Sequence, residues 1–301
     1  MTGVAELVVG LVLVVGAADV FLDGLLGASA RWRLSPFVLT VVLSGLELEN
    51  LAAGLAANAH GLPDAAAGTF LGGTTFLALA VAGLGAVVAP MPSRLPRPAI
   101  AWTAAAPLPL LLFASDGRVS RAEGALLLGW SLFALLAIAR SGRALPVHES
   151  VPAKRWTLLR LVGGLAVLTG AGDLLGAGIK RVVFQLHVPE TLLGNTAIAA
   201  SVEAEELGRV LAPARRGRSE LALANVTATI VHFVALNAGI IALARPLALH
   251  HSSVRLHLPV AVGATLLLTS LLATRRQLGR PEGAILLSAY AAYIAAAIIS
   301  A

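Results

Sequence analysis

The chain has 301 residues, of which 57% are hydrophobic and only 13% are charged. Soluble domains carry about 25% charged residues, so this composition excludes a soluble globular protein and indicates an integral membrane protein. The lack of cysteine excludes disulfides and thiolate chemistry, and a formal charge of +6 in such a chain indicates basic loops, not a nucleic-acid surface.

Clusters of proline, glycine and arginine divide the chain into apolar segments that are each long enough to cross a bilayer as a helix. We expect ten spans, at 4–22, 36–59, 65–88, 99–114, 123–140, 157–179, 190–211, 221–244, 256–273 and 283–300. No segment has the pattern of a strand. The sequence therefore predicts an all-α polytopic membrane protein.

The longest polar stretch, Ser141–Trp156, lies in the middle of the chain and is too short to form a domain. It divides the chain into residues 1–140, a linker loop at 141–156, and residues 157–301. Each half contains five of the expected spans. An odd number of spans means that the second half is inverted relative to the first.

Basic residues orient the spans, because Lys and Arg accumulate in cytoplasmic loops. Of the 22 basic residues, all but six fall in alternate connections on one side. The six on the other side are Arg118, Arg121, Lys180, Arg181, Arg245 and Arg255. This asymmetry predicts that loop 141–156 is cytoplasmic and that both termini are outside.

The two halves are related by an offset of 156 residues. At this offset Glu47 aligns with Glu203, Glu49 with Glu205, and Asn50 with Glu206. Inverted repeats are typical of secondary transporters, whose substrate site lies at the midplane where the repeats meet. The acidic stretches SGLELENL and ASVEAEEL both fall near the middle of an expected span.

Carboxylates at this depth cost several kcal/mol unless they bind a proton or a cation or form ion pairs. We expect no Lys or Arg at the same depth, which leaves cations or protons. Residues three apart share a helical face, so the favoured cluster is Glu47, Asn50, Glu203 and Glu206. Its three glutamates, Glu47, Glu203 and Glu206, are the expected metal ligands, because hard cations such as Ca²⁺ prefer oxygen.

Further candidates are polar residues near this cluster. Glu49 and Glu205 point away from the favoured face and are candidate proton carriers, because crowded carboxylates retain protons more readily. Neighbouring spans contribute candidate oxygen ligands and one residue that titrates near neutral pH. These candidates are Thr74, Asn225, Thr229 and His232.

The pattern resembles the cation/calcium exchanger superfamily, which includes sodium/calcium exchangers. The resemblance rests on GLPD at Gly61–Asp64, on GAADVFLDGLLGASARWRLSPFVL at Gly16–Leu39, and on the paired acidic stretches. It implies ten helices in two inverted halves, with the family's ion-binding glutamates aligned to Asn50 and Glu206. It also implies alternating access, in which the first and sixth spans slide past a core formed by the second, third, seventh and eighth.

The alpha repeats diverge from the family pattern, which reads GTSxPEL followed by GNxxGSNxxN. Here GTSxPE is replaced by GLELEN and SVEAEE, and the final polar position of each repeat falls on Leu77 and on Phe233.

The sequence favours a secondary active antiporter that exchanges Ca²⁺, another divalent cation or Na⁺ against H⁺ or Na⁺ in the cell membrane. The alternative is a family relative that does not transport and acts as a membrane sensor or assembly partner. An enzyme is not expected, because the chain has no HExxH motif or comparable histidine cluster. The expected partners are lipid and small inorganic cations, without nucleic acid or a cofactor.

Overall fold

The computed structural model describes residues 2–44, 48–92, 95–142, 155–185 and 203–299. Within these ranges the chain is helical apart from short turns and four two-residue strands. The helices of the first half are α1 (Thr2–Trp32), α2 (Pro36–Leu43), α3 (Leu48–Ala59), α4 (Pro63–Thr75), η1 (Phe76–Val81), α5 (Ala82–Val88), α6 (Arg97–Ala105), α7 (Leu108–Phe113), η2 (Ala114–Asp116) and α8 (Arg121–Ser141). Those of the second half are α9 (Thr157–Gln185), α12 (Ala204–Arg215), α13 (Ser219–Val231), η5 (His232–Asn237), α14 (Ala238–Ala244), η6 (Ser253–His257), α15 (Leu258–Arg275) and α16 (Arg280–Ile299).

Eight helical segments among the described residues are long and apolar enough to cross a membrane. They are Gly3–Trp32, Pro63–Val88, Arg97–Asp116, Arg121–Ser141, Thr157–Gly178, Ser219–Ala244, Ser253–Arg275 and Arg280–Ile299. The expected helical class is thus confirmed. The expected span 36–59 is divided between α2 and α3, and the expected span 190–211 is described only from Glu203 onward.

Two segments form the centre of the bundle. In Pro63–Val88 and in Ser219–Ala244, 83% of the apolar window is buried, against 28% in Arg121–Ser141 and in Arg280–Ile299. Each central segment contains one π-helical stretch, η1 or η5, and such stretches are common at functional sites. The more exposed helices surround this core and present apolar side chains outward, as expected of surfaces that contact lipid.

Element bounds in the two halves recur at an offset of 156 residues. The offset relates α3 to α12, α4 to α13, η1 to η5 and α5 to α14. It also relates Gly61 (φ 77°) to Gly217 (φ 70°), and both glycines adopt the left-handed conformation that a sharp turn requires. Local sequence therefore produces the same succession of helix, turn and π-helical segment twice.

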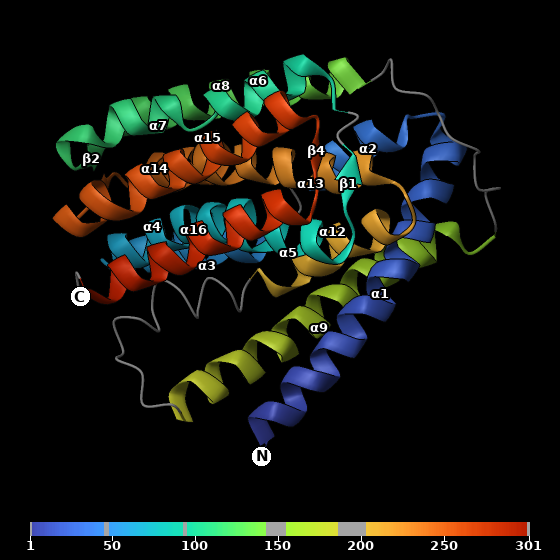
Figure 1. The fold of residues 1–301 in the computed structure, drawn as a ribbon. Coiled ribbons are helices and arrows are strands. Elements are labelled where there is room, and N and C mark those ends of the chain that lie inside the picture. Colours follow the sequence, from blue (N-terminus) through green and yellow to red (C-terminus); the bar gives the residue numbers. More distant parts are fainter. Residues whose placement is uncertain (1, 45–47, 93–94, 143–154, 186–202, 300–301) are drawn as a thin grey trace.

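Helices α1 and α9 run side by side and extend away from the other helices (Figure 1). Their contact passes through glycines, since a Cβ on Gly10 would meet Leu175 and one on Gly24 would meet Leu161. The pair is therefore antiparallel, and the missing side chains allow the two backbones to approach closely.

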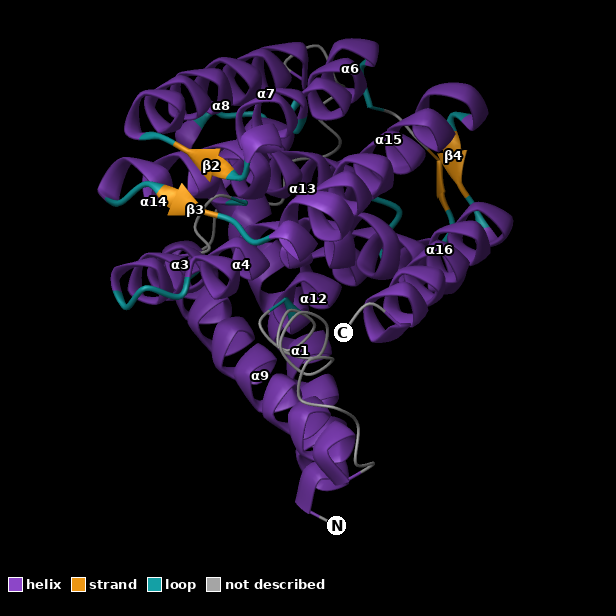
Figure 2. Cartoon of the chain, turned by 90° about the vertical axis from the view of Figure 1, so that its left-hand side faces the viewer, coloured by secondary structure: helices purple, strands orange, loops and turns teal. Residues whose placement is uncertain are grey.

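Short strands correct the expectation that the chain contains none. β1 (Met91–Pro92) pairs with β4 (Gln277–Leu278), and β2 (Arg118–Val119) pairs with β3 (Leu247–Ala248), both antiparallel. The two sheets lie on opposite sides of the bundle (Figure 2). Two-residue strands carry too little pattern to be recognised in a sequence, and only the folded chain brings these loops together.

Candidate functional site

The two acidic stretches meet through Asn50 and Glu203. Asn50 lies in the first turn of α3, and Glu203 immediately precedes α12. The Asn50 Nδ2 donates a hydrogen bond of 2.7 Å to the Glu203 Oε1, and both side chains are buried. The contact joins residues 153 positions apart and brings the helices of the two halves together.

Glu203 occupies a cradle beside α4. A Cβ placed on Gly73 would lie 2.9 Å from the Glu203 Oε1 and 3.0 Å from the Phe233 ring. Glu203 is 1% exposed, and its Oε2 has no hydrogen-bond partner among the described residues. A buried carboxylate oxygen without a donor is costly, so this side chain has a strong tendency to take up a proton or a cation.

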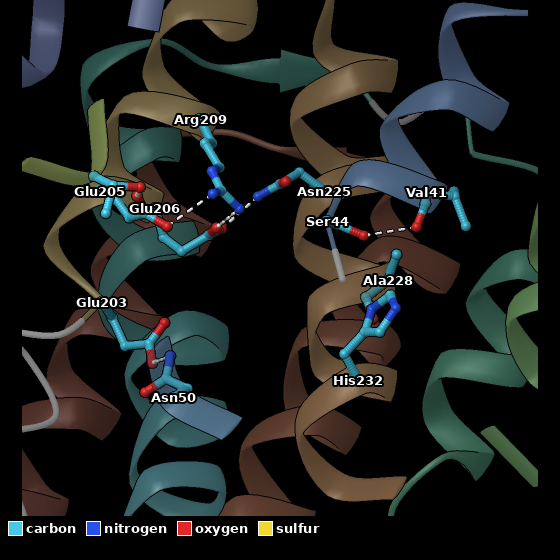
Figure 3. A network of polar contacts seen from close by, with 11 residues as sticks. Val41, Ser44, Asn50, Glu203, Glu205, Glu206, Arg209, Asn225, Ala228 and His232 are labelled. Carbon is cyan, nitrogen blue, oxygen red and sulfur yellow. Dashed lines mark hydrogen bonds and ion pairs between the residues drawn. The ribbon is translucent and has the colours of Figure 1, made fainter. Parts of the chain in front are cut away.

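Glu205 and Glu206 flank a buried arginine (Figure 3). The Arg209 guanidinium lies 2.7 Å from the Glu205 Oε1 and 3.0 Å from the Glu206 Oε1. Arg209 is 5% exposed. The expectation that no Lys or Arg lies at the depth of the acids was therefore wrong.

The remaining oxygens of these two glutamates accept hydrogen bonds from other helices. Thr169 Oγ1 of α9 donates to the Glu205 Oε2 over 2.6 Å, and the Asn225 Nδ2 of α13 donates to the Glu206 Oε2. Glu205 thus faces α9, and Glu206 faces the core helix α13.

The remaining predicted site residues are Glu47, Glu49, Thr74, Thr229 and His232. Glu47 lies outside the described residues, and Glu49 is exposed. Thr74 Oγ1 donates to the Phe70 carbonyl of its own helix, and the buried Thr229 Oγ1 has no partner among the described residues. His232 is buried, and its Nδ1 lies 2.8 Å from the Ala228 carbonyl oxygen one turn earlier.

Sequence reasoning missed Arg209, Thr169 and Gly73. A signal for Arg209 was present, because it follows Glu205 by four residues and Glu206 by three, which is the spacing of helical ion pairs. Thr169 and Gly73 carry no such signal, since each acts across a contact between helices distant in sequence. No group of three or more acidic or histidine side chains in the described part of the chain is arranged to hold a metal ion.

The geometry is that of a buried polar site at the starts of α3 and α12 in a helical membrane protein. A family model for the sodium/calcium exchanger protein matches residues 2–139 and 156–299. The chain belongs to this family. The resemblance to the cation/calcium exchangers is thus confirmed. Because its relatives are ion transporters, the expectation that this exchanger-family protein is not an enzyme is confirmed as well.

Individual relatives agree with the family assignment. CaxA of Alkalimonas amylolytica, named as a candidate antiporter, is 29% identical over 310 residues and 95% of each chain. Inner membrane protein YrbG of Escherichia coli is 29% identical over 267 residues, which is 80% of each chain. The sodium/calcium exchanger MaX1 of Methanosarcina acetivorans is 30% identical over 146 residues, covering 45% of this chain and 42% of that protein.

A solved structure of the sodium-calcium exchanger NCX_Mj, soaked with zero Na⁺ and Ca²⁺, superposes with a TM-score of 0.80. The match covers 98% of both chains at 23% sequence identity. At this identity the likeness establishes a shared fold, and it does not identify the transported ion.

Proposed function

We propose that the exchanger-family protein is a secondary active antiporter that exchanges a cation, either Ca²⁺, another divalent ion or Na⁺, against H⁺ or Na⁺. The observation that carries this proposal is the buried carboxylate of Glu203, of which Asn50 holds one oxygen and no described residue donates a hydrogen bond to the other. Such a carboxylate is driven to exchange a proton for a cation, because an apolar surrounding does not stabilise its bare charge. Glu47, Asn50 and Glu206 complete the proposed site.

The proposed architecture is ten spans in two inverted five-helix repeats, residues 1–140 and 157–301, joined by loop 141–156. The recurrence of element bounds at an offset of 156 residues supports it. The two spans beyond the eight continuous ones would be α2 with α3, and the segment that ends in α12. Each of these two spans carries one of the acidic stretches, and transporter sites typically lie near the midplane where the repeats meet.

Alternating access would move α1 and α9 past the core. Their glycine-lined contact supports movement as a pair, and α9 contacts the site through Thr169 and Glu205. In the orientation proposed from the basic residues, loop 141–156 is cytoplasmic and both termini are outside the cell membrane.

Reconstitution into proteoliposomes tests the function. Uptake of ²²Na⁺ and of ⁴⁵Ca²⁺ is measured under an imposed proton or sodium gradient for the wild type, for Glu203→Gln and for the control Glu123→Gln. Glu123 is a suitable control because it lies in an exposed capping box at the start of α8. We expect gradient-driven flux that Glu203→Gln abolishes and Glu123→Gln retains, and an absence of flux under either gradient would contradict the proposal.

A second candidate is a family relative without transport activity, acting as a membrane sensor or assembly partner. It is favoured by the apolar Leu77 and Phe233, both fully buried where the family pattern is polar. Cation-dependent thermal stability without any flux in the same proteoliposome preparation would support this candidate over the antiporter.

A further inference from the structure

Arg209 places a fixed positive charge inside the proposed cation site. Its guanidinium bridges the Oε1 atoms of Glu205 and Glu206 from the same helix (Figure 3). When all are ionised, Glu203, Glu205 and Glu206 carry a formal charge of −3, and together with Arg209 the four side chains carry −2.

Arg209, Thr169 and Asn225 also donate hydrogen bonds to carboxylate oxygens that could otherwise bind a cation. Both oxygens of Glu205 accept hydrogen bonds, from Arg209 and Thr169, and both oxygens of Glu206 do so from Arg209 and Asn225. The Glu203 Oε2 is the one oxygen of these three carboxylates without a hydrogen-bond partner among the described residues. Ca²⁺ takes six to eight oxygen ligands, and while the guanidinium is in place these carboxylates offer a divalent cation one oxygen that accepts no hydrogen bond from the described residues.

We propose that Arg209 is a tethered counter-ion that sets the charge class of the transported cation. It neutralises one charge of the Glu205–Glu206 pair, and the donors Thr169 and Asn225 stabilise the charge that remains. Glu203 then binds one singly charged ion, Na⁺ or H⁺, in preference to a divalent cation. This inference rests on the proposed function, since it takes Glu203 as the residue that binds the transported cation.

The surroundings of Arg209 favour a fixed position over release into solvent. The guanidinium lies 6.0 Å from the centre of the Phe21 ring in α1, within range of a cation–π interaction. The space beside Arg209 and Asn225, lined also by Phe21, Thr40 and Pro213, is small, with a cavity volume of about 20 Å³. The helices α1 and α9, which move in the proposed mechanism, therefore both contact this group: Phe21 of α1 lies beside Arg209, and Thr169 of α9 donates a hydrogen bond to Glu205.

The test compares three variants of the full-length protein purified in detergent: Arg209→Gln, Arg209→Lys and the double variant Glu205→Gln/Arg209→Gln. Thermal stability is titrated with NaCl and with CaCl₂, which gives apparent affinities without requiring transport. We expect Arg209→Gln to raise the preference for Ca²⁺ over Na⁺ at least about tenfold, because it removes the counter-ion and frees two carboxylate oxygens. Arg209→Lys retains the charge and the wild-type preference.

The double variant has the same formal charge as the wild type and is expected to keep the preference for the singly charged ion. If Arg209→Gln does not fold, the double variant provides the test. A higher preference of the double variant for Ca²⁺ over Na⁺ would overturn the proposal. An unchanged preference in folded Arg209→Gln would overturn it as well. Failure of the proposed function can be distinguished from failure of this inference. In the former case the wild-type protein binds cations but shows no flux in proteoliposomes.

Discussion

At the scale of single residues, the position of the Glu203 carboxylate depends on the absence of a Cβ atom at Gly73. Gly73 provides space for the Glu203 Oε1, while the Asn50 Nδ2 donates a hydrogen bond to the same oxygen. Phe233 closes the same cradle. The result is a carboxylate whose position is defined by two other helices of the core and by one amide donor.

Replacing Gly73 with alanine should displace this carboxylate, because the new Cβ would lie 2.9 Å from the Glu203 Oε1. We expect cation flux to fall about tenfold or more, since shifts of a ligand group by about 1 Å cost this much or more in related chemistry. Flux in proteoliposomes and size-exclusion profiles measure activity and folding separately. The matched control is Gly263→Ala, whose Cβ meets no atom within 4 Å. Wild-type flux in Gly73→Ala would show that Glu203 need not keep this position.

At the scale of elements, glycines set the contact between α1 and α9. A Cβ on Gly10, Gly24, Gly164 or Gly178 would lie within 3 Å of backbone atoms of the facing helix. Gly10 relates to Gly164, and Gly24 to Gly178, by an offset of 154 residues. Lipid supplies no hydrophobic drive for such pairs, so close packing of small residues is the main source of their association.

Substituting Gly24 with alanine should push the helices apart, because its Cβ would lie 2.2 Å from the Leu161 backbone nitrogen. We expect a loss of stability of about 1–3 kcal/mol, the usual cost of overpacking. Thermal denaturation in detergent measures the change. Gly16→Ala is the control on the same helix, since its Cβ meets nothing within 4 Å, and an equal effect of both variants would refute the packing argument.

At the scale of the whole molecule, the two halves are joined reciprocally. β1, which follows the first central segment, pairs with β4, and β2 pairs with β3, which follows the second central segment. Close glycine contacts join the halves in the same reciprocal way. Gly83 of α5 packs against Gly283 of α16, and Gly239 of α14 packs against Gly124 of α8. Each central segment is thus fixed by peripheral helices of the opposite half.

The proposed orientation can be checked with single cysteines, because the chain contains none. Ser115 lies on the side of Arg118, and Gln277 on the side of Arg275; both are exposed. We expect a membrane-impermeant maleimide to label Ser115→Cys in intact cells and to label Gln277→Cys only after permeabilisation. The reverse pattern would invert the proposed orientation.

The sequence by itself determined the membrane class, the helical fold, the family and the repeat at an offset of 156 residues. The first two follow from composition and hydrophobic segments, and the repeat follows from an alignment of the two halves. The family follows from the resemblance of GLPD and of Gly16–Leu39 to known exchangers. The sequence also pointed to Asn50 and Glu203, because acids and amides in apolar segments are conspicuous wherever they finally pack.

Only the tertiary structure decided which side chains are partners. Asn50 meets Glu203 and Thr169 meets Glu205 through contacts between helices, and their geometry depends on how segments distant in sequence pack. Arg209 is one of the basic residues that the sequence predicts on the cytoplasmic side, near the end of the expected span 190–211. Its burial against two glutamates depends on the packing of α12 among α1, α9 and α13, since depth in a bundle is a property of packing and not of local sequence.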